Sequence, residues 1–189
     1  MNGKIILITG GARSGKSSFA LKEASEISGK KAYIATAEAL DGEMKERIEK
    51  HKRDRGNEWD TYEEPVKIQT VIKAIEGRYN AIVIDCLTLW LSNMMCRGAE
   101  TADEINNLID VLTNVGAGLA LPNKIGEPMP APTIFIVSNE VGMGIVPENE
   151  MARKFRDMAG TLNQKVAEVA NEVYLIIAGI PVRIKGGKR

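Results

Sequence analysis

Cysteine is scarce in this chain of 189 residues, and histidine is scarcer still. Cys86 and Cys96 are the only two cysteines, and no further cysteine or histidine residues accompany them as metal ligands. This excludes a disulfide framework and a cysteine-based metal site, so we expect both thiols to be reduced. His51 is the only histidine, so any chemistry that needs an imidazole has to use this residue.

A net charge and a long apolar run are also missing. The 25 lysine and arginine side chains balance 25 aspartate and glutamate side chains. No overall field therefore attracts a nucleic acid or an anionic membrane, and any anion site must be local. No segment approaches the roughly 18 apolar residues that a membrane span needs, and the apolar run at residues 5–9 is too short for a signal peptide. We expect a soluble cytoplasmic protein that binds no nucleic acid.

Short β-branched runs alternate along the chain with longer segments of helical periodicity. This alternation is typical of crossover units, in which helices cover both faces of a parallel sheet. We predict strands at residues 4–9, 32–36, 81–85, 133–138 and 173–178, with a short edge strand at 182–185. We predict helices at residues 16–28, 41–53, 65–75, 87–95, 102–115 and 150–171. Segment 116–132, rich in glycine and proline, is predicted to be a surface loop, so residues 1–189 form a single domain.

A glycine-rich loop follows the first predicted strand and precedes the first predicted helix. Gly10, Gly15, Lys16 and Ser17 match the pattern of a phosphate-binding loop (P-loop), in the context that this pattern requires. Backbone N–H groups of such a loop wrap a phosphate, the lysine reaches the β and γ phosphates, and the serine is a ligand for Mg²⁺. The alternative is a chance glycine-rich turn. The predicted nucleotide-binding loop comprises Gly10, Gly11, Ala12, Arg13, Ser14, Gly15, Lys16 and Ser17.

Asp85 ends the buried strand predicted at residues 81–85. P-loop enzymes take a second Mg²⁺ ligand from the end of a neighbouring hydrophobic strand, and open parallel sheets bind ligands at the carboxyl ends of their strands. We therefore predict Asp85 in the site, as a metal ligand or as a base for the substrate hydroxyl. Its alternative role is to cap the helix that begins at Leu87. The fold predicted from these features is a three-layer α/β P-loop NTPase domain of the RecA-like kind, with a mostly parallel central sheet.

The segment after the fourth predicted strand reads SNEVGMGIVPEN, residues 138–149. It brings the amide of Asn139 and the carboxylate of Glu140 to the same sheet edge as Lys16, so we assign both residues to a shared site. From the residues alone, a plain loop between a strand and a helix is an equal alternative.

Six basic residues crowd around His51 and predict a local site for a second anionic group. They are Lys45, Arg47, Lys50, Lys52, Arg53 and Arg55. A histidine nucleophile has to be neutral, and neighbouring cations favour that form. The carboxyl end of a helix favours the charged form, so the two influences oppose each other. A packed histidine, on one helical stripe with Leu40, Met44 and Ile48, is the structural alternative.

Several longer segments together resemble one enzyme family over nearly the whole chain. The segments read GGARSGKS (10–17), YIATAEA (33–39), DGEMKERIEKHKRDRG (41–56), EEP (63–65), SNEVGMGIVPEN (138–149) and ARKFRDMAGTLNQKVAEVANEVYLIIAGIPVRIK (152–185). They are similar to the bifunctional adenosylcobinamide kinase / adenosylcobinamide-phosphate guanylyltransferase of cobalamin biosynthesis. The segment around His51 and the segment NEVGMGIVPEN are specific to that family, whereas the P-loop alone matches many families.

The resemblance implies two reactions at one nucleotide site. The enzyme first phosphorylates the aminopropanol hydroxyl of adenosylcobinamide with ATP or GTP. It then transfers GMP from GTP to the new phosphate, through a covalent GMP-histidine at the position of His51, and releases pyrophosphate. The resemblance also implies a homotrimer that binds a corrinoid. The further nucleotide-binding residues that it implies are Ala35, Thr36, Ala37, Arg53, Asp54, Arg55, Gly56, Glu63 or Glu64, and Asp85.

Two other functions compete with this interpretation. A P-loop kinase of another small alcohol would leave His51 with a structural role. A motor-type NTP-binding module of the recombinase kind is disfavoured, because the short, charge-balanced chain leaves little room for DNA-binding loops. The methionines are predicted to fill the core instead of forming a corrinoid surface. They are Met94, Met95, Met143, Met151 and Met158.

Overall fold

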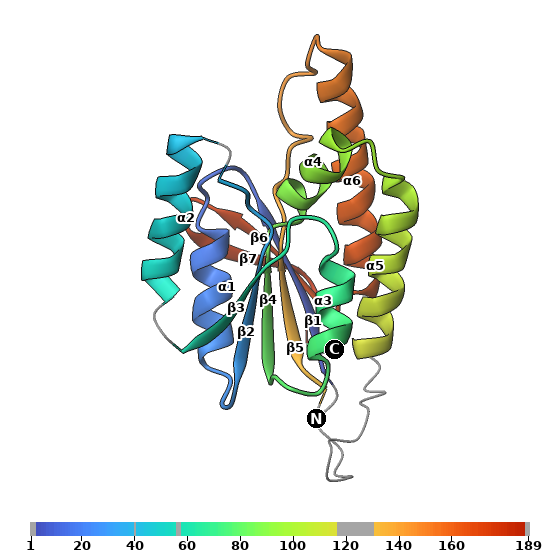
Figure 1. Cartoon of the computed structure of the whole chain (residues 1–189). Helices are drawn as coiled ribbons and strands as arrows, with labels where there is room; N and C mark the ends of the chain where they lie inside the picture. Colours follow the sequence, from blue (N-terminus) through green and yellow to red (C-terminus); the bar gives the residue numbers. More distant parts are fainter. Residues whose placement is uncertain (1–2, 40, 56–57, 117–130, 188–189) are drawn as a thin grey trace.

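The computed structural model describes residues 3–39, 41–55, 58–116 and 131–187, which form an α/β fold of three layers (Figure 1). The strands are β1 (Ile5–Gly10), β2 (Lys31–Ala35), β3 (Trp59–Glu63), β4 (Ala81–Asp85), β5 (Thr133–Val137), β6 (Glu172–Ile177) and β7 (Ile180–Lys185). The helices are α1 (Lys16–Ser25), α2 (Gly42–Arg55), α3 (Ile68–Ile75), α4 (Leu87–Cys96), α5 (Thr101–Gly116) and α6 (Glu150–Val169). The described side chains do not include those of Arg47, Lys50, His51, Asp54, Arg55 and Gly116.

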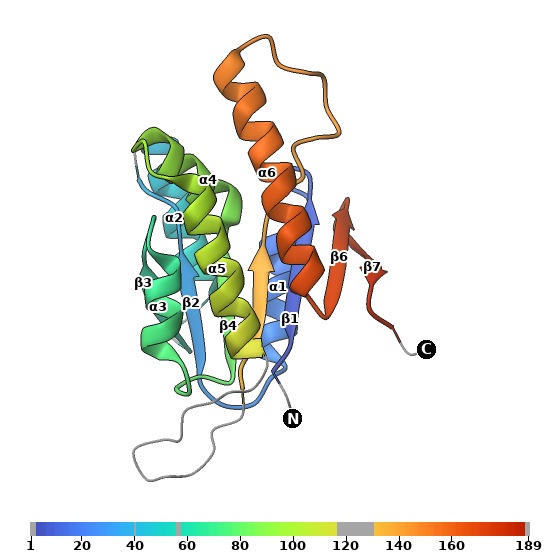
Figure 2. The same ribbon diagram turned by 90° about the vertical axis from the view of Figure 1, so that its right-hand side faces the viewer.

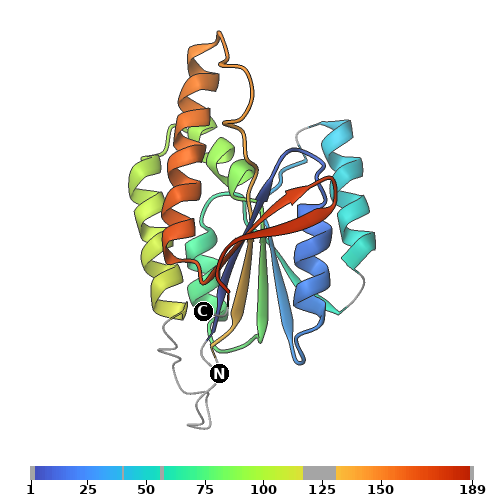
Figure 3. The same cartoon turned by 180° about the vertical axis from the view of Figure 1, so that it is seen from behind.

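The seven strands form a single sheet in the order β3-β2-β4-β5-β1-β6-β7. All neighbouring strands run parallel except β6 and β7, which form an antiparallel hairpin at one edge (Figure 3). The parallel strands end at the same edge of the sheet, with Asp85 opposite Ala35 on one side and opposite Val137 on the other. The predicted class of fold, three layers around a mostly parallel sheet, is confirmed.

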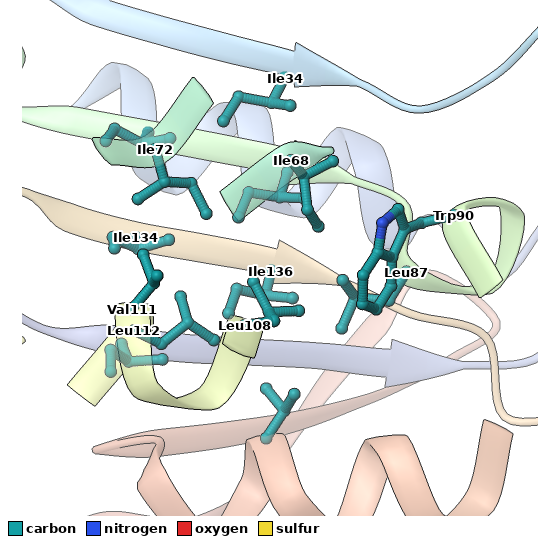
Figure 4. Close-up of a cluster of buried hydrophobic side chains, with 14 of the residues drawn as sticks. Ile34, Ile68, Ile72, Leu87, Trp90, Leu108, Val111, Leu112, Ile134 and Ile136 are labelled. Carbon is teal, nitrogen blue, oxygen red and sulfur yellow. The ribbon is translucent and has the colours of Figure 1, made fainter. Parts of the chain in front are cut away.

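Alternation along the strands divides the core between the two faces of the sheet. Leu7, Ile34, Ile84 and Ile136 face α3, α4, α5 and α6, where they meet a buried cluster that includes Trp90 (Figure 4). The intervening residues, such as Ile8 and Phe135, face α1 and form a smaller second cluster. Figures 1 and 2 show α1 and α2 on one face of the sheet and the four other helices on the opposite face.

Two predictions about elements were wrong. Residues 59–63 form the edge strand β3, which was not predicted, because WDTYE lacks an apolar run and its side chains are exposed or only half-buried. The third helix begins at Ile68 and not at Pro65, because the carboxylate of Glu64 accepts hydrogen bonds from the N–H groups of Val66 and Lys67 and holds a turn there.

The prediction that the methionines fill the core is correct only in part. Met94 is buried, and Met95 and Met158 pack against the main core cluster. Met143 and Met151 are 80% and 71% exposed. Both lie in the part of the chain from the loop after β5 to the first turn of α6, which extends beyond the end of the sheet (Figure 2).

Candidate active site

The P-loop joins the end of β1 to the start of α1. Gly10 and Gly15 have φ angles of 147° and 99°, which favour glycine. A Cβ at Gly10 would lie 2.4 Å from the carbonyl oxygen of Ile176, so the loop can approach β6 this closely only without a side chain at that position. The N–H of Gly179, in the β6–β7 turn, donates to the carbonyl of Ser14 at 2.9 Å. The hairpin therefore supports the loop from one side.

Lys16 lies at the bottom of the loop and is 6% exposed. Its Nζ donates to the carbonyl oxygen of Gly11 at 2.5 Å and lies 3.5 Å from the hydroxyl of Ser14. A buried ammonium held against the loop backbone is positioned to meet the phosphates of a nucleotide that the loop wraps.

A cavity of about 650 Å³ opens in front of this loop. It is lined from four directions, by the P-loop, the end of β4, the end of β5 and helix α2. Its lining includes Arg13, Ser14, Gly15, Lys16, Ser17, Glu43, Glu46, Arg53, Asp85, Cys86 and Asn139. This volume lies in the range of small-molecule sites, and the position matches the ligand-binding edge of open α/β sheets.

Asp85 enters this cavity from the last position of β4. Its Oδ2 accepts a hydrogen bond of 2.7 Å from the hydroxyl of Tyr33 on the neighbouring strand β2. The residue that caps helix α4 is Cys86, and no side chain caps that helix. The alternative role of Asp85 as a helix cap is therefore wrong, and its carboxylate faces the site.

Asn139 and Glu140 follow β5 and make different contacts. The side-chain amide of Asn139 donates to the hydroxyl of Thr88 at 2.9 Å, and Asn139 lines the cavity. Glu140 contacts the loop only through its backbone, whose N–H donates to the carbonyl of Gly10 at 2.9 Å. The carboxylate of Glu140 instead accepts from the N–H of Gly142. The structure thus brings Asn139 to the cavity, while Glu140 positions the P-loop.

A second, smaller pocket adjoins the cavity beneath α2. Ser17, Asp85 and Cys86 line both spaces, and the smaller pocket adds mostly apolar groups. These are Tyr33, Ala35, Ala37, Met44, Ile48, Lys52 and Leu89. Its mostly apolar lining is of the kind that contacts an apolar part of a ligand whose phosphates lie in the cavity.

Thr36 has a structural contact in place of a ligand-facing one. It is fully buried, and its hydroxyl donates to the carbonyl of Cys86 at 2.8 Å and accepts from the N–H of the same residue at 2.7 Å. The resemblance implies Ala35, Thr36 and Ala37 as nucleotide-binding residues, and of these Ala35 and Ala37 line the smaller pocket.

The remaining implied nucleotide ligands divide between α2 and the end of β3. Arg53 lines the cavity. Glu63 forms an ion pair of 2.5 Å with Lys52 of α2, whereas the carboxylate of Glu64 caps the turn before α3. Of the two glutamates, Glu63 is the one that faces the helix carrying His51. The side chains of Asp54 and Arg55, and all of Gly56, lie outside the described part of the chain.

Sequence reasoning missed two acidic residues of the site, Glu43 and Glu46 on α2. Together with Arg53 they recur at helical spacing, and that signal was available in the sequence. Glu43 pairs with Arg13 at 3.6 Å, but both side chains are more than 80% exposed, so the pair contributes little to stability. A phosphate can therefore displace Glu43 from Arg13 at low cost.

The described lining carries no excess of positive charge, because Arg13, Lys16 and Arg53 face Glu43, Glu46 and Asp85. A triphosphate would consequently be bound better with a cation that neutralises part of its charge. The hydroxyl of Ser17 and the carboxylate of Asp85 are oxygen donors of the kind that Mg²⁺ prefers. The described residues contain no group of three histidine, cysteine, aspartate or glutamate side chains that could hold a metal ion. The site fits Mg²⁺ carried by a nucleotide.

The strand, loop and helix around Lys16 and the acid at the end of β4 define a P-loop nucleotide-binding protein. A solved structure of the RadB recombinase has the same fold, with a TM-score of 0.51 over 92% of this chain and 74% of that chain, at 15% identity. Within this class, residues 6–184 match the family described as cobinamide kinase / cobinamide phosphate guanyltransferase, and the chain belongs to that family.

Two relatives support this assignment across nearly their full length. The bifunctional adenosylcobalamin biosynthesis protein CobP of Pseudomonas aeruginosa is 40% identical over 181 residues, covering 95% of this chain and 96% of the relative. The bifunctional adenosylcobalamin biosynthesis protein CobU of Salmonella typhimurium is 40% identical over 185 residues, covering 96% of this chain and 99% of the relative. No helix in the described ranges has the length and apolar character needed to cross a bilayer.

Proposed function

We propose that this chain is a bifunctional enzyme of cobalamin biosynthesis. It phosphorylates adenosylcobinamide with ATP or GTP and then transfers GMP from GTP to adenosylcobinamide phosphate, which yields adenosylcobinamide-GDP and pyrophosphate. The observation that carries this proposal is the family match over residues 6–184, together with a single cavity that holds Lys16, Ser17 and Asp85. Because both reactions consume nucleoside triphosphates, we expect the enzyme in the cytoplasm.

The kinase reaction needs positioning and charge stabilisation more than covalent chemistry. The hydroxyl oxygen of the aminopropanol arm forms a bond to the γ-phosphorus, and the bond from that phosphorus to the β–γ bridging oxygen breaks. Backbone N–H groups of the P-loop and the ammonium of Lys16 stabilise the charge on the transferred group. Bound Mg²⁺, held through Ser17 and Asp85, would neutralise charge on the same phosphates. If Asp85 is instead a base, its carboxylate receives the proton of the attacking hydroxyl.

The transfer reaction uses the α-phosphorus of GTP. We assign the nucleophile to His51, whose neutral imidazole nitrogen forms a bond to the α-phosphorus while pyrophosphate leaves. A phosphate oxygen of the acceptor then attacks the same phosphorus and releases the histidine. Position 51 supports this role because it follows Ile48 by three residues, on the helical face whose members Met44 and Ile48 line the smaller pocket. Arg53, two residues further on, lines the phosphate cavity.

A homotrimer is the proposed assembly. Two exposed apolar surfaces of the described chain support association between copies. The first is the edge strand β7, all of whose residues are exposed, including Ile180, Val182 and Ile184. The second lies after β5 and includes Met143 and Ile145, which is 96% exposed. An unpaired edge strand with apolar side chains is a common site of pairing between chains.

A product assay tests the two reactions separately. The enzyme is incubated with adenosylcobinamide, Mg²⁺ and either ATP or GTP, and the corrinoids are separated and weighed by mass spectrometry. We expect phosphorylated adenosylcobinamide with ATP, and adenosylcobinamide-GDP when GTP is present. If adenosylcobinamide phosphate were the only corrinoid product with GTP, the protein would be a small-molecule kinase without guanylyltransferase activity.

A further inference from the structure

Tyr33, the first residue of the segment YIATAEA, is a buried phenol that contacts the acid of the site. It is 2% exposed and lies in the middle of β2, opposite Val83 of β4. Asp85 lies two residues after Val83, so Tyr33 and Asp85 are diagonal neighbours on one face of the sheet. The tyrosine hydroxyl spans this diagonal and donates to Oδ2 of Asp85 at 2.7 Å.

We infer that Tyr33 is a positioning residue, which fixes the carboxylate of Asp85 in the orientation that receives the Mg²⁺–nucleotide complex. This inference rests on the proposed function. The terminal torsion of an aspartate is broad, so the backbone alone does not determine where its two oxygens point. A hydrogen bond to Oδ2 selects one orientation and leaves Oδ1 for the metal or for the proton of the substrate hydroxyl.

The surroundings of Tyr33 make it a rigid donor. Its ring packs edge-on against Trp59, with centroids 6.3 Å apart and planes at 90°. The backbone of Asp85 is held as well, because its carbonyl accepts from the N–H of Thr36 at 3.1 Å, so the hydrogen bond from Tyr33 has only the side-chain torsions of Asp85 to fix. Tyr33 also lines the smaller pocket together with Ser17 and Asp85, so it reaches the place where both proposed metal ligands meet.

A comparable tyrosine–aspartate pair lies outside the site, between the segment before β4 and strand β3. The hydroxyl of Tyr79 donates to Oδ2 of Asp60 at 2.6 Å, and neither residue lines the cavity or the smaller pocket. The Tyr79 hydroxyl also lies 2.7 Å from the hydroxyl of Tyr62, so Tyr79→Phe removes a phenol–carboxylate hydrogen bond and a phenol–phenol contact, both outside the nucleotide site. An effect shared by Tyr33→Phe and Tyr79→Phe reports on the fold, and an effect of Tyr33→Phe alone reports on the site.

The test compares Tyr33→Phe, Tyr79→Phe and wild type by calorimetric titration, in Mg²⁺ and in EDTA, below the melting temperature of each protein. The titrant is GTP with a methylene group in place of the α–β bridging oxygen, so that no GMP is transferred to the enzyme during the titration. For each protein, the ratio of the dissociation constant in EDTA to that in Mg²⁺ measures how much Mg²⁺ strengthens GTP binding. We expect this ratio to be about tenfold smaller in Tyr33→Phe than in the other two proteins, as is typical when a partner of a metal ligand is lost. The dissociation constant in EDTA should be the same in all three. A second readout is the Mg²⁺ concentration for half-maximal kinase rate, which should rise in Tyr33→Phe at constant KM for adenosylcobinamide.

The role of Tyr33 would be overturned if Mg²⁺ increased the affinity for GTP equally in wild type and Tyr33→Phe, or if Mg²⁺ increased it in neither. The product assay on wild type distinguishes that result from a failure of the proposed function. A wild type that forms both products while Tyr33→Phe binds Mg²⁺–GTP equally well contradicts only the positioning role.

Discussion

At the scale of single residues, Lys16 is held by the fold in a position suited to phosphate binding. Its stem is buried in the P-loop and its ammonium is held by the carbonyl of Gly11, in the position from which it can reach a phosphate. The sequence pattern predicts a phosphate-binding role for this residue and for Ser17, because the loop geometry needs these residue types at that spacing. Tyr33 was not predicted, because a tyrosine inside a buried strand cannot be told from a core residue without its partner.

Lys16→Ala should abolish both activities, with the affinity for GTP and the kinase rate each falling by at least about a hundredfold. The physical reason is the loss of the one buried cation of the described cavity lining. Calorimetric titration with GTP and the product assay measure the two effects. Lys22→Ala, an exposed lysine of the same helix, is the matched control and should behave as wild type. Retained GTP binding in Lys16→Ala would contradict the assigned position of the triphosphate.

The two cysteines should differ sharply in reactivity. Burial raises the pKa of the Cys86 thiol, and the neighbouring Asp85 carboxylate raises it further, so less thiolate is present at any given pH. Cys96 is exposed. At pH 8 we expect iodoacetamide to modify Cys96 first, and Cys86 more slowly by about a hundredfold or more.

Peptide mass spectrometry over time measures these rates, and Cys96→Ser isolates the reaction of Cys86. Because the pKa of Cys86 is raised, its labelling in the folded protein should keep increasing as pH rises above the ordinary range for thiols. Comparable rates at the two cysteines near pH 8 would show that Cys86 is accessible and ionised, contrary to the structure.

At the scale of elements, the sequence predicted the parallel strands better than the edges. Strands β1, β2, β4 and β5 are runs of mostly buried residues, and β6 is a partly buried apolar run, so composition alone indicates them. Strand β3 pairs with a neighbour on one side only, and its residues WDTYE give no such signal. The site could be predicted where a motif or a strand end defines it, whereas the contribution of Glu43 and Glu46 depends on where α2 packs.

The close packing of the P-loop on strand β6 should exclude any side chain at position 10, whether or not a nucleotide is bound. Gly10→Ala would bring a Cβ to 2.4 Å from the carbonyl of Ile176, and should lower the free energy of unfolding by about 2 kcal/mol or more. Gly11→Ala is the control, because a Cβ at that position meets nothing within 4 Å and should change stability by less than about 0.5 kcal/mol. Urea unfolding without nucleotide measures both values. Equal stabilities for the two variants would contradict the packing of the P-loop on β6.

At the scale of the whole molecule, one domain has to hold a triphosphate for reaction at two different phosphorus atoms. The P-loop and α2 both line the cavity, so different elements can contact the γ and α phosphates of one nucleotide. The described side chains of α2 reach both the cavity and the smaller pocket. In the proposed mechanism, this arrangement lets a kinase and a nucleotidyltransferase use one site.

Assembly through β7 predicts that a charged residue there separates the subunits. Ile184→Lys should convert the trimer to monomers at micromolar concentration, because it introduces a charge on an exposed apolar edge strand. Light scattering after size-exclusion chromatography measures the mass. Asn114→Lys, on the exposed face of α5, is the control and should leave the mass unchanged. A wild type that is monomeric, or a trimeric Ile184→Lys, would contradict an interface through this strand.

The central claim is that one site cuts GTP at the α as well as the γ position, with His51 as the covalent carrier. The most direct measurement incubates wild type and His51→Ala with GTP labelled in parallel at each phosphate, with Mg²⁺ and without corrinoid, followed by denaturing electrophoresis and treatment with acid and base. We predict an α label on wild type that is labile in acid and stable in base, absent from His51→Ala, with kinase activity retained in the variant. A wild type that binds GTP without retaining the α label would contradict the account.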